Sequence, residues 1–240
     1  MKNKTILITG ASRGIGLALA KQLSVNNTVL AVARDKARLD ALAKSHGVIA
    51  LPTDLSERCQ VEALIVNVAT HWPELSVLFN NAAIQQPLDF LQEWQPHKLD
   101  TELTINLHSP IRLCHGFIPL LAAQKESWII NTTSVLAVSP KQSTPVYNAS
   151  KAALRLFTQA LRYQLHHTCI KVCEVIPPVT NTALSNASAK QNSPSPEWVA
   201  GQILSQLNIG KTQVEVGQAR LGMILHRWLP NLLHSMLIKG

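Results

Sequence analysis

The stretch TILITGASRGIG, residues 5–16, joins a short apolar run to a turn with three glycines. Residues 5–9 are apolar and rich in β-branched side chains, which is typical of a strand buried on both faces. Glycines at 10, 14 and 16 follow in a GxxxGxG spacing, and an apolar helical pattern continues to Leu23. The stretch therefore predicts a strand, a tight turn and the start of a helix.

Each glycine of this turn has a separate physical use. Gly10 permits a tight turn, Gly14 lets the backbone approach a phosphate, and Gly16 lets the helix pack closely on the strand. The helix N-terminus then offers free N–H groups and a positive dipole to a pyrophosphate. The position of the turn, after the first strand and before a helix, indicates a dinucleotide site.

Beyond residue 16 the pattern alternates between short apolar runs and helical segments. Further strands are expected at residues 29–33, 48–51, 75–79, 128–133, 171–176 and 214–216. A long helix is expected over residues 99–123, with Asn106 in its interior. Such alternation predicts one α/β domain, 1–240, with a parallel sheet covered by helices on both faces.

Composition limits the kinds of partner. The 240 residues are 46% hydrophobic and 15% charged, which allows a large core, and the net charge is +8. Such a charge is consistent with nucleic acid, an anionic membrane or, equally, an anionic cofactor; the basic residues are scattered rather than clustered, so we expect no nucleic acid. No run of 18 uncharged apolar residues is present, which argues against a membrane-spanning helix.

The cysteines and the first residues indicate a reducing compartment. The four cysteines form no CxxC pair, and no histidine cluster has zinc-finger spacing, so no metal site is expected. The apolar run within residues 1–9 is too short for a signal peptide. A cytoplasmic protein with free, mostly buried thiols is therefore expected.

The end of the second strand bears on cofactor choice. An enzyme selective for NAD normally places an acid there to hold the ribose 2′-hydroxyl, but here Ala33 is followed by Arg34. Arg13 in the glycine turn adds a second cation, and two guanidiniums suit a 2′-phosphate. The alternative is two ordinary surface arginines. Asp35 is interpreted as the N-cap of a helix over residues 36–44.

The segment Tyr147-Asn148-Ala149-Ser150-Lys151 places a phenol and an ammonium four residues apart, on one helix face. A nearby cation lowers a tyrosine pKa from its usual ~10, and such a phenol can exchange a proton with a carbonyl or alcohol oxygen. Ser134, at the end of the strand before this helix, can face Tyr147. The alternative is an ordinary solvated helix face.

Taken together, these motifs resemble those of the short-chain dehydrogenase/reductase family, over roughly residues 4–217. Residues 9–16 look like its TGxxxGxG cofactor turn and residues 80–82 like its NNAG motif. The single positions that match the family are Asp54, Asn106, Ser134, Tyr147 and Lys151. The resemblance implies a single-domain, Rossmann-like, doubly wound sheet of about seven parallel strands.

Two positions depart from the family pattern. Ala83 replaces the last glycine of the NNAG motif. Pro178 replaces the glycine of a Pro-Gly pair after the sixth strand, and because proline lacks an N–H, contact with the nicotinamide carboxamide is expected to change. Thr180 and Thr182 are the candidates for that contact.

The resemblance also implies a reaction: hydride transfer between NADP(H), with NADPH preferred over NADH, and a small carbonyl or alcohol. Tyr147 would be the general acid/base, and Lys151 would lower its pKa and hold the nicotinamide ribose. Ser134 would bind the substrate oxygen, and Asn106 would position a relay water. The expected cofactor contacts are Gly10, Ser12, Arg13, Gly14, Ile15, Gly16, Arg34, Asp54, Leu55, Asn81, Ala82, Tyr147, Lys151, Pro177, Thr180 and Thr182.

A non-catalytic NADP(H) sensor or scaffold is the alternative function, since the fold alone does not separate the two. The complete set of Ser134, Tyr147, Lys151 and Asn106 favours catalysis, because a sensor does not need Tyr147. Residues 181–196 are polar and are interpreted as a substrate lid.

The last segment, residues 219–240, is an apolar helical tail. Its large apolar residues recur at intervals of three and four, and Pro230 should kink or divide the helix. The stripe can pack on its own domain, form a subunit interface, or attach to an anionic membrane surface. Because the family is commonly oligomeric, we expect a homodimer or homotetramer to which the tail contributes.

Overall fold

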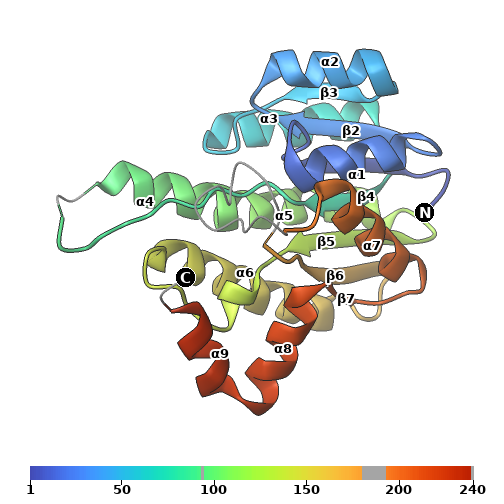
Figure 1. The fold of residues 1–240 in the computed structure, drawn as a ribbon. Helices are drawn as coiled ribbons and strands as arrows, with labels where there is room; N and C mark the ends of the chain where they lie inside the picture. The colour runs from blue at the N-terminus through green and yellow to red at the C-terminus, as the bar shows by residue number, and fades with distance from the viewer. Residues whose placement is uncertain (93–94, 180–192, 239–240) are drawn as a thin grey trace.

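The sheet is the centre of the computed structural model, which describes residues 1–92, 95–179 and 193–238. Seven parallel strands are ordered β3-β2-β1-β4-β5-β6-β7 (Figure 1). They are β1 (Thr5–Thr9), β2 (Thr28–Ala33), β3 (Ile49–Pro52), β4 (Leu75–Asn80), β5 (Ser127–Thr132), β6 (Ile170–Ile176) and β7 (Gln213–Glu215). The predicted strands are thus found, with ends shifted by one residue in several of them.

Helices connect the strands and cover both faces of the sheet. They are α1 (Gly14–Ser24), α2 (Lys36–His46), α3 (Arg58–His71), α4 (Pro96–Leu103), α5 (Ser109–Ala122), α6 (Pro145–Gln164), α7 (Pro196–Asn208), α8 (Gln218–Trp228) and α9 (Pro230–Leu237). A π-helical turn, η1 (Thr104–His108), lies between α4 and α5, and a 3₁₀ turn, η2 (Val135–Ala137), follows β5. The doubly wound α/β prediction is therefore confirmed. No helix in the described ranges has the length and hydropathy that crossing a membrane requires.

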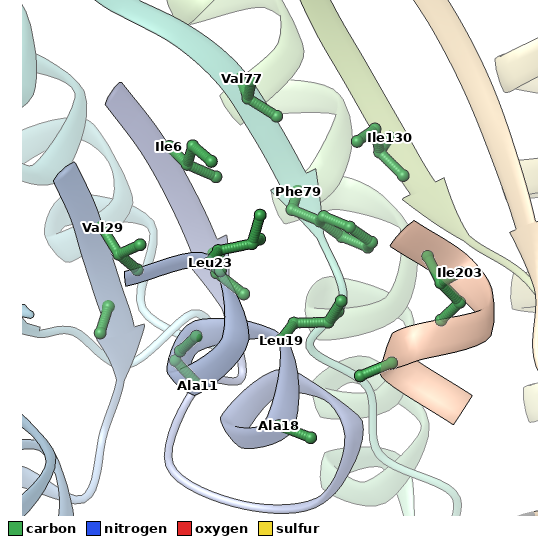
Figure 2. Close-up of a cluster of buried hydrophobic side chains, with 14 of the residues drawn as sticks. Ile6, Ala11, Ala18, Leu19, Leu23, Val29, Val77, Phe79, Ile130 and Ile203 are labelled. Carbon is green, nitrogen blue, oxygen red and sulfur yellow. The ribbon is translucent and has the colours of Figure 1, made fainter. Parts of the chain in front are cut away.

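Two apolar layers form the core because side chains alternate along each strand. Ile6 and Ile8 of β1 pack with α1 and α7, whereas Leu7 between them packs on the opposite face with α3 and α5. Figure 2 shows the first layer, where Phe79 of β4 and Leu19 of α1 meet beneath the sheet. Burial on both faces explains why the strands read as continuous apolar runs.

The strand order reverses beside β1. The chain winds outward from β1 through β2 to β3, then returns to β4 on the other side of β1 and continues to β7. A cleft lies at this point, lined by the segments that follow the carboxyl ends of β1, β2, β3 and β4. Open α/β sheets bind their ligands at such a switch point.

The single helix predicted over residues 99–123 is wrong in detail. Helices α4 and α5 are separated by the π-helical turn η1, which contains Asn106. A π turn inserts one residue into the helix and is frequent at functional sites.

Candidate functional site

The glycine turn after β1 is a close contact between backbone segments. Gly10 has φ +70°, and a Cβ at Gly16 would overlap the carbonyl oxygen of Gly10. Arg13, at the N-cap of α1, makes no side-chain cap hydrogen bond. The first turn of α1 therefore lacks a side-chain cap, which suits a helix N-terminus that receives an anion.

The loop after β4 is attached to the same turn. The Thr9 hydroxyl accepts hydrogen bonds from the backbone N–H groups of Asn81 and Ala82, both at 3.0 Å. The Asn81 amide donates to the Thr9 carbonyl at 3.1 Å. The amide side chain predicted to contact a cofactor is thus used to join β1 to β4, while Asn81 still lines the crevice.

A cleft of about 310 Å³ occupies the switch point. It brings together, from the predicted cofactor contacts, Gly10, Ser12, Arg13, Gly14, Ile15, Arg34, Asp54, Leu55, Asn81, Ala82, Tyr147, Lys151 and Pro177. Gly16 is buried behind this lining. Thr180, Thr182 and most of the predicted lid lie outside the described residues.

Three arginines surround one end of the cleft. Arg13 and Arg34 line it as predicted, and Arg38 joins them; all three are exposed. Asp35 accepts a hydrogen bond from the Arg38 backbone N–H, as predicted for the N-cap of α2, and pairs with the Arg38 guanidinium at 3.1 Å. Arg38 was missed by the sequence analysis, although its spacing of four from Arg34 was a usable signal.

Asp54 is both a cleft residue and a turn residue. One of its carboxylate oxygens accepts hydrogen bonds from the Ser56 backbone N–H at 2.9 Å and from the Ser56 hydroxyl at 2.7 Å. The neighbouring Leu55 carbonyl accepts from the buried Ser109 hydroxyl at 2.6 Å. The loop after β3 is therefore fixed in place against the cleft.

Tyr147 and Lys151 lie at the other end of the cleft, on α6. The two side chains are buried, 6% and 1% exposed, which overturns the alternative of a solvated helix face. The Lys151 ammonium lies 5.8 Å from the centroid of the Tyr147 ring and donates to the Thr132 carbonyl at 2.8 Å. Ser134 is hydrogen-bonded to Tyr147, as its position after β5 predicts.

Burial dominates the protonation of this pair. It raises the pKa of Tyr147 to about 12, against the opposing effect of the Ser134 hydrogen bond, and the charge of Glu102 adds to the rise. It lowers the pKa of Lys151 to about 8, with Glu102 acting in the opposite direction. The net lowering of the Tyr147 pKa expected from the sequence is therefore not found, because burial, which disfavours the phenolate, is the largest influence on this group.

Asn106 fastens the loop after β4 to α6. Its Oδ1 accepts from the Ile84 N–H at 2.9 Å, and its Nδ2 donates to the Ile84 carbonyl at 2.8 Å and to the Ser150 hydroxyl at 3.2 Å. Both amide hydrogens are therefore engaged. Positioning of a water by Asn106 would have to use the remaining lone pair of Oδ1 or the main-chain carbonyl.

The family model for short-chain dehydrogenases matches residues 4–193, which contain the glycine turn and the Ser134, Tyr147 and Lys151 constellation. The chain belongs to the short-chain dehydrogenase family. It is thereby an oxidoreductase by family, and the predicted resemblance is confirmed. The α8–α9 segment lies beyond the matched residues.

Individual relatives agree with this assignment. The uncharacterised oxidoreductase DltE of Bacillus subtilis is 40% identical over 191 residues, which are 78% of this chain and 76% of DltE. A short-chain dehydrogenase from Sphingobium yanoikuyae, solved in complex with NADPH, has a TM-score of 0.81 at 25% identity and covers 95% of both chains. A Burkholderia cenocepacia short-chain dehydrogenase, solved in complex with NADP, has a TM-score of 0.87 at 24% identity and covers 100% of this chain and 99% of its own.

In this short-chain dehydrogenase, Glu102 is the residue that sequence reasoning missed most clearly. It lies one turn before Asn106, is 1% exposed, and its Oε1 has no hydrogen-bond partner. Burial raises its pKa to about 7, while a hydrogen bond from the Gln86 backbone and the charge of Lys151 oppose the rise. A lone glutamate in a helix carries no signal of burial, so only the packing of α4 on α6 reveals it.

Proposed function

We propose that the protein is an NADP(H)-dependent oxidoreductase of class EC 1.1.1.- that interconverts a carbonyl and an alcohol, with Tyr147 as general acid/base. One observation carries the proposal. Tyr147, Ser134 and Lys151 gather at the carboxyl ends of the strands, and Tyr147 and Lys151 line the same cleft as the glycine turn. A catalytic phenol and a phosphate-binding turn thus share one crevice.

The residues at the arginine end fit a phosphorylated dinucleotide. The packing at Gly16 leaves no room for a side chain and holds α1 close to the turn after β1, so the uncapped first turn of α1 borders the cleft where a pyrophosphate would bind. Arg13 and Arg34 suit a 2′-phosphate, and Asp35 is occupied by Arg38 rather than free to hold a ribose hydroxyl. The NADPH in the Sphingobium relative supports the same cofactor, and NADPH is preferred over NADH.

The chemistry divides between cofactor and protein. A bound nicotinamide supplies or accepts the hydride at the substrate carbon. In reduction, Tyr147 gives its hydroxyl proton to the substrate oxygen, and in oxidation it takes that proton back. Its raised pKa keeps the proton in place before the reaction.

Neighbouring residues assist this proton transfer. Ser134 donates a hydrogen bond to the same substrate oxygen and stabilises its developing charge. The Lys151 ammonium, held by the Thr132 carbonyl, stabilises the phenolate that remains. Asn106 holds the loop and helix on which these groups stand.

The nicotinamide end has a proline where the family pattern has glycine. Pro177 lines the cleft, and Pro178 offers no backbone N–H. Contact with the nicotinamide carboxamide is therefore expected to differ from the family pattern, and Thr180 and Thr182 stay the candidates for it. A small carbonyl or alcohol is the substrate class.

The test is a carbonyl library screened with NADPH, read as loss of NADPH absorbance, and an alcohol library screened with NADP. Turnover of at least one substrate by the native protein is expected. NADPH binding by titration, without turnover of any member, would instead favour the sensor or scaffold alternative. Turnover of any substrate found is then measured again with the Tyr147→Phe variant.

A further inference from the structure

Helices α8 and α9 form a hairpin that projects from the sheet edge near β7 (Figure 1). The predicted division at Pro230 is confirmed, since α8 ends at Trp228 and α9 begins at Pro230. Six large apolar side chains on the hairpin are exposed, between 47% and 72% of their surface. They are Leu221, Ile224, Trp228, Leu229, Leu232 and Met236.

The exposed residues form a second apolar face on each helix. The inner face of α8 packs through Ala219 and Met223 against Ile176, and Leu233 of α9 is also buried. The outer residues of α8 lie at 221, 224 and 228, and those of α9 at 229, 232 and 236. Both sets have spacings of three and four, so each helix presents a continuous apolar stripe to the outside.

The hairpin is held firmly at both ends. Gly222 of α8 packs so closely on η2 that a Cβ there would come within 3.0 Å of the Val135 side chain. At the other end, the Ile238 carbonyl accepts a hydrogen bond from the Gln142 N–H at 3.0 Å. The hairpin is thus attached to the segment between Ser134 and Tyr147 and presents its outer face on a fixed support.

The hairpin itself carries formal charge of one sign. Residues 216–240 contain two arginines, one lysine and two histidines but no aspartate or glutamate. A groove of about 590 Å³ runs beside α8, where the guanidinium of Arg227 lies 5.4 Å from the Trp228 ring centroid. Its lining combines basic and apolar groups with one amide and one acid: Arg155, Gln213, Glu215, Met223, Ile224, His226, Arg227 and Trp228.

We propose that the α8–α9 hairpin docks on an anionic phospholipid surface. The outer apolar stripes would enter the boundary between headgroups and acyl chains, where tryptophan is favoured. Arg220 and Arg227 would lie against the lipid phosphates, each adding to attraction by a negative surface. Docked in this way, the segment that follows Ser134 lies next to the membrane.

A second copy of the chain fits this face less well. In a two-fold interface the same patch meets itself, so the positive charge that Arg220 and Arg227 give one copy would face the same charge on the other. The hairpin has no carboxylate of its own in residues 216–240, and Glu215 is the one acid in the groove beside it, so the face keeps a net positive charge that opposes self-association. Assembly through other faces remains compatible with docking on lipid.

The experiment is sedimentation of the full-length protein with vesicles of phosphatidylcholine alone or with about one third phosphatidylglycerol. We expect pelleting with the anionic vesicles and at least tenfold weaker binding in high salt. The double variant Trp228→Ala/Leu232→Ser should bind at least tenfold more weakly. The matched control Val66→Ser/Ile209→Ser removes similarly exposed apolar groups from α3 and the end of α7 and should bind as the native protein does.

Three results would overturn the proposal: no pelleting of the native protein, equal pelleting of the hairpin variant, or equal binding to neutral vesicles. Light scattering tests for the alternative occupant, a second copy of the chain. A native dimer that becomes monomeric only in the hairpin variant would place that copy on this face. Circular dichroism checks that each variant is folded. The lipid measurement requires no turnover, so it stands or falls separately from the proposed reaction.

Discussion

The two ends of the cleft handle charge in opposite ways. At the arginine end of the cleft, the side chains of Arg13, Arg34 and Arg38 are exposed to solvent. At the catalytic end, Tyr147 and Lys151 are buried beside Glu102. Exposed charges contribute small, graded energies, whereas buried ones are governed by the cost of removing an ion from water.

This difference predicts how each end tolerates change. Replacement of one arginine at the arginine end should weaken cofactor binding only by that arginine's own contribution, because solvent hydrates the exposed groups that remain. Removal of one atom at the catalytic end changes which groups are protonated, because each charge there is stabilised mainly by its neighbours. Four variants, in order of expected effect, test this contrast.

The largest effect is expected for Tyr147→Phe. The ring and its packing are kept and the transferable proton is removed, so turnover should fall by roughly 10²–10⁴ while NADPH affinity stays nearly unchanged. Tyr163→Phe is the matched control, since Tyr163 is the other tyrosine of the chain and is exposed. Steady-state kinetics with a substrate from the screen measure both, and near-native turnover in the first variant would remove Tyr147 from the mechanism.

The next effect is expected for Arg34→Asp. Loss of a charged hydrogen bond to the 2′-phosphate costs about 1.5–3 kcal/mol, so NADPH affinity should fall roughly ten- to a hundredfold while NADH affinity is spared or improved. Lys125→Asp makes the same charge change at a distant exposed position. Titration of both cofactors measures the ratio, and native protein that binds NADH as tightly as NADPH would contradict the arginine argument.

Glu102→Gln tests the buried end through stability. Because the folded protein holds the Glu102 proton up to about pH 7, and the unfolded chain releases it near the usual glutamate pKa, native stability should fall as pH rises through this window. The variant lacks this titration. Between about pH 4.5 and about pH 7.5, the free energy of unfolding of the native protein should therefore fall by about 1.4–3 kcal/mol more than that of the variant.

Urea unfolding of both proteins at about pH 4.5 and 7.5 measures this difference. Glu57→Gln, at an exposed glutamate, retains Glu102, so its free energy of unfolding should differ from that of the native protein by the same amount at both pH values. The same result for Glu102→Gln would mean that the Glu102 carboxyl titrates normally and that the buried end does not behave as described.

The smallest effect is expected for Arg38→Gln. Arg38 is already paired with Asp35, and an exposed pair contributes ~0–1 kcal/mol, so NADPH affinity should fall only a fewfold. A loss as large as that of Arg34→Asp would instead show that Arg38 carries the phosphate. Comparison of the two variants in one titration series therefore ranks the arginines.

Helices α8 and α9 show which features a local sequence pattern can predict. Periodicity and Pro230 correctly predict two tail helices, because local backbone restrictions decide them. The same reading fails at residues 99–123, since the π turn at Asn106 depends on the hydrogen bonds that its side chain makes to Ile84 and Ser150. These partners lie far along the chain and leave no local trace.

The sequence by itself determined the strands, the glycine turn and the Tyr147–Lys151 spacing, because these rest on apolar runs, backbone freedom and helical repeat. Tertiary structure alone decided that Glu102 is buried beside Lys151 and that Tyr147 has a raised pKa. It also decided that the side-chain amides of Asn81 and Asn106 form hydrogen bonds with the backbone of Thr9 and Ile84. The physical reason is that burial and protonation depend on the groups brought together from distant segments, which local patterns do not encode.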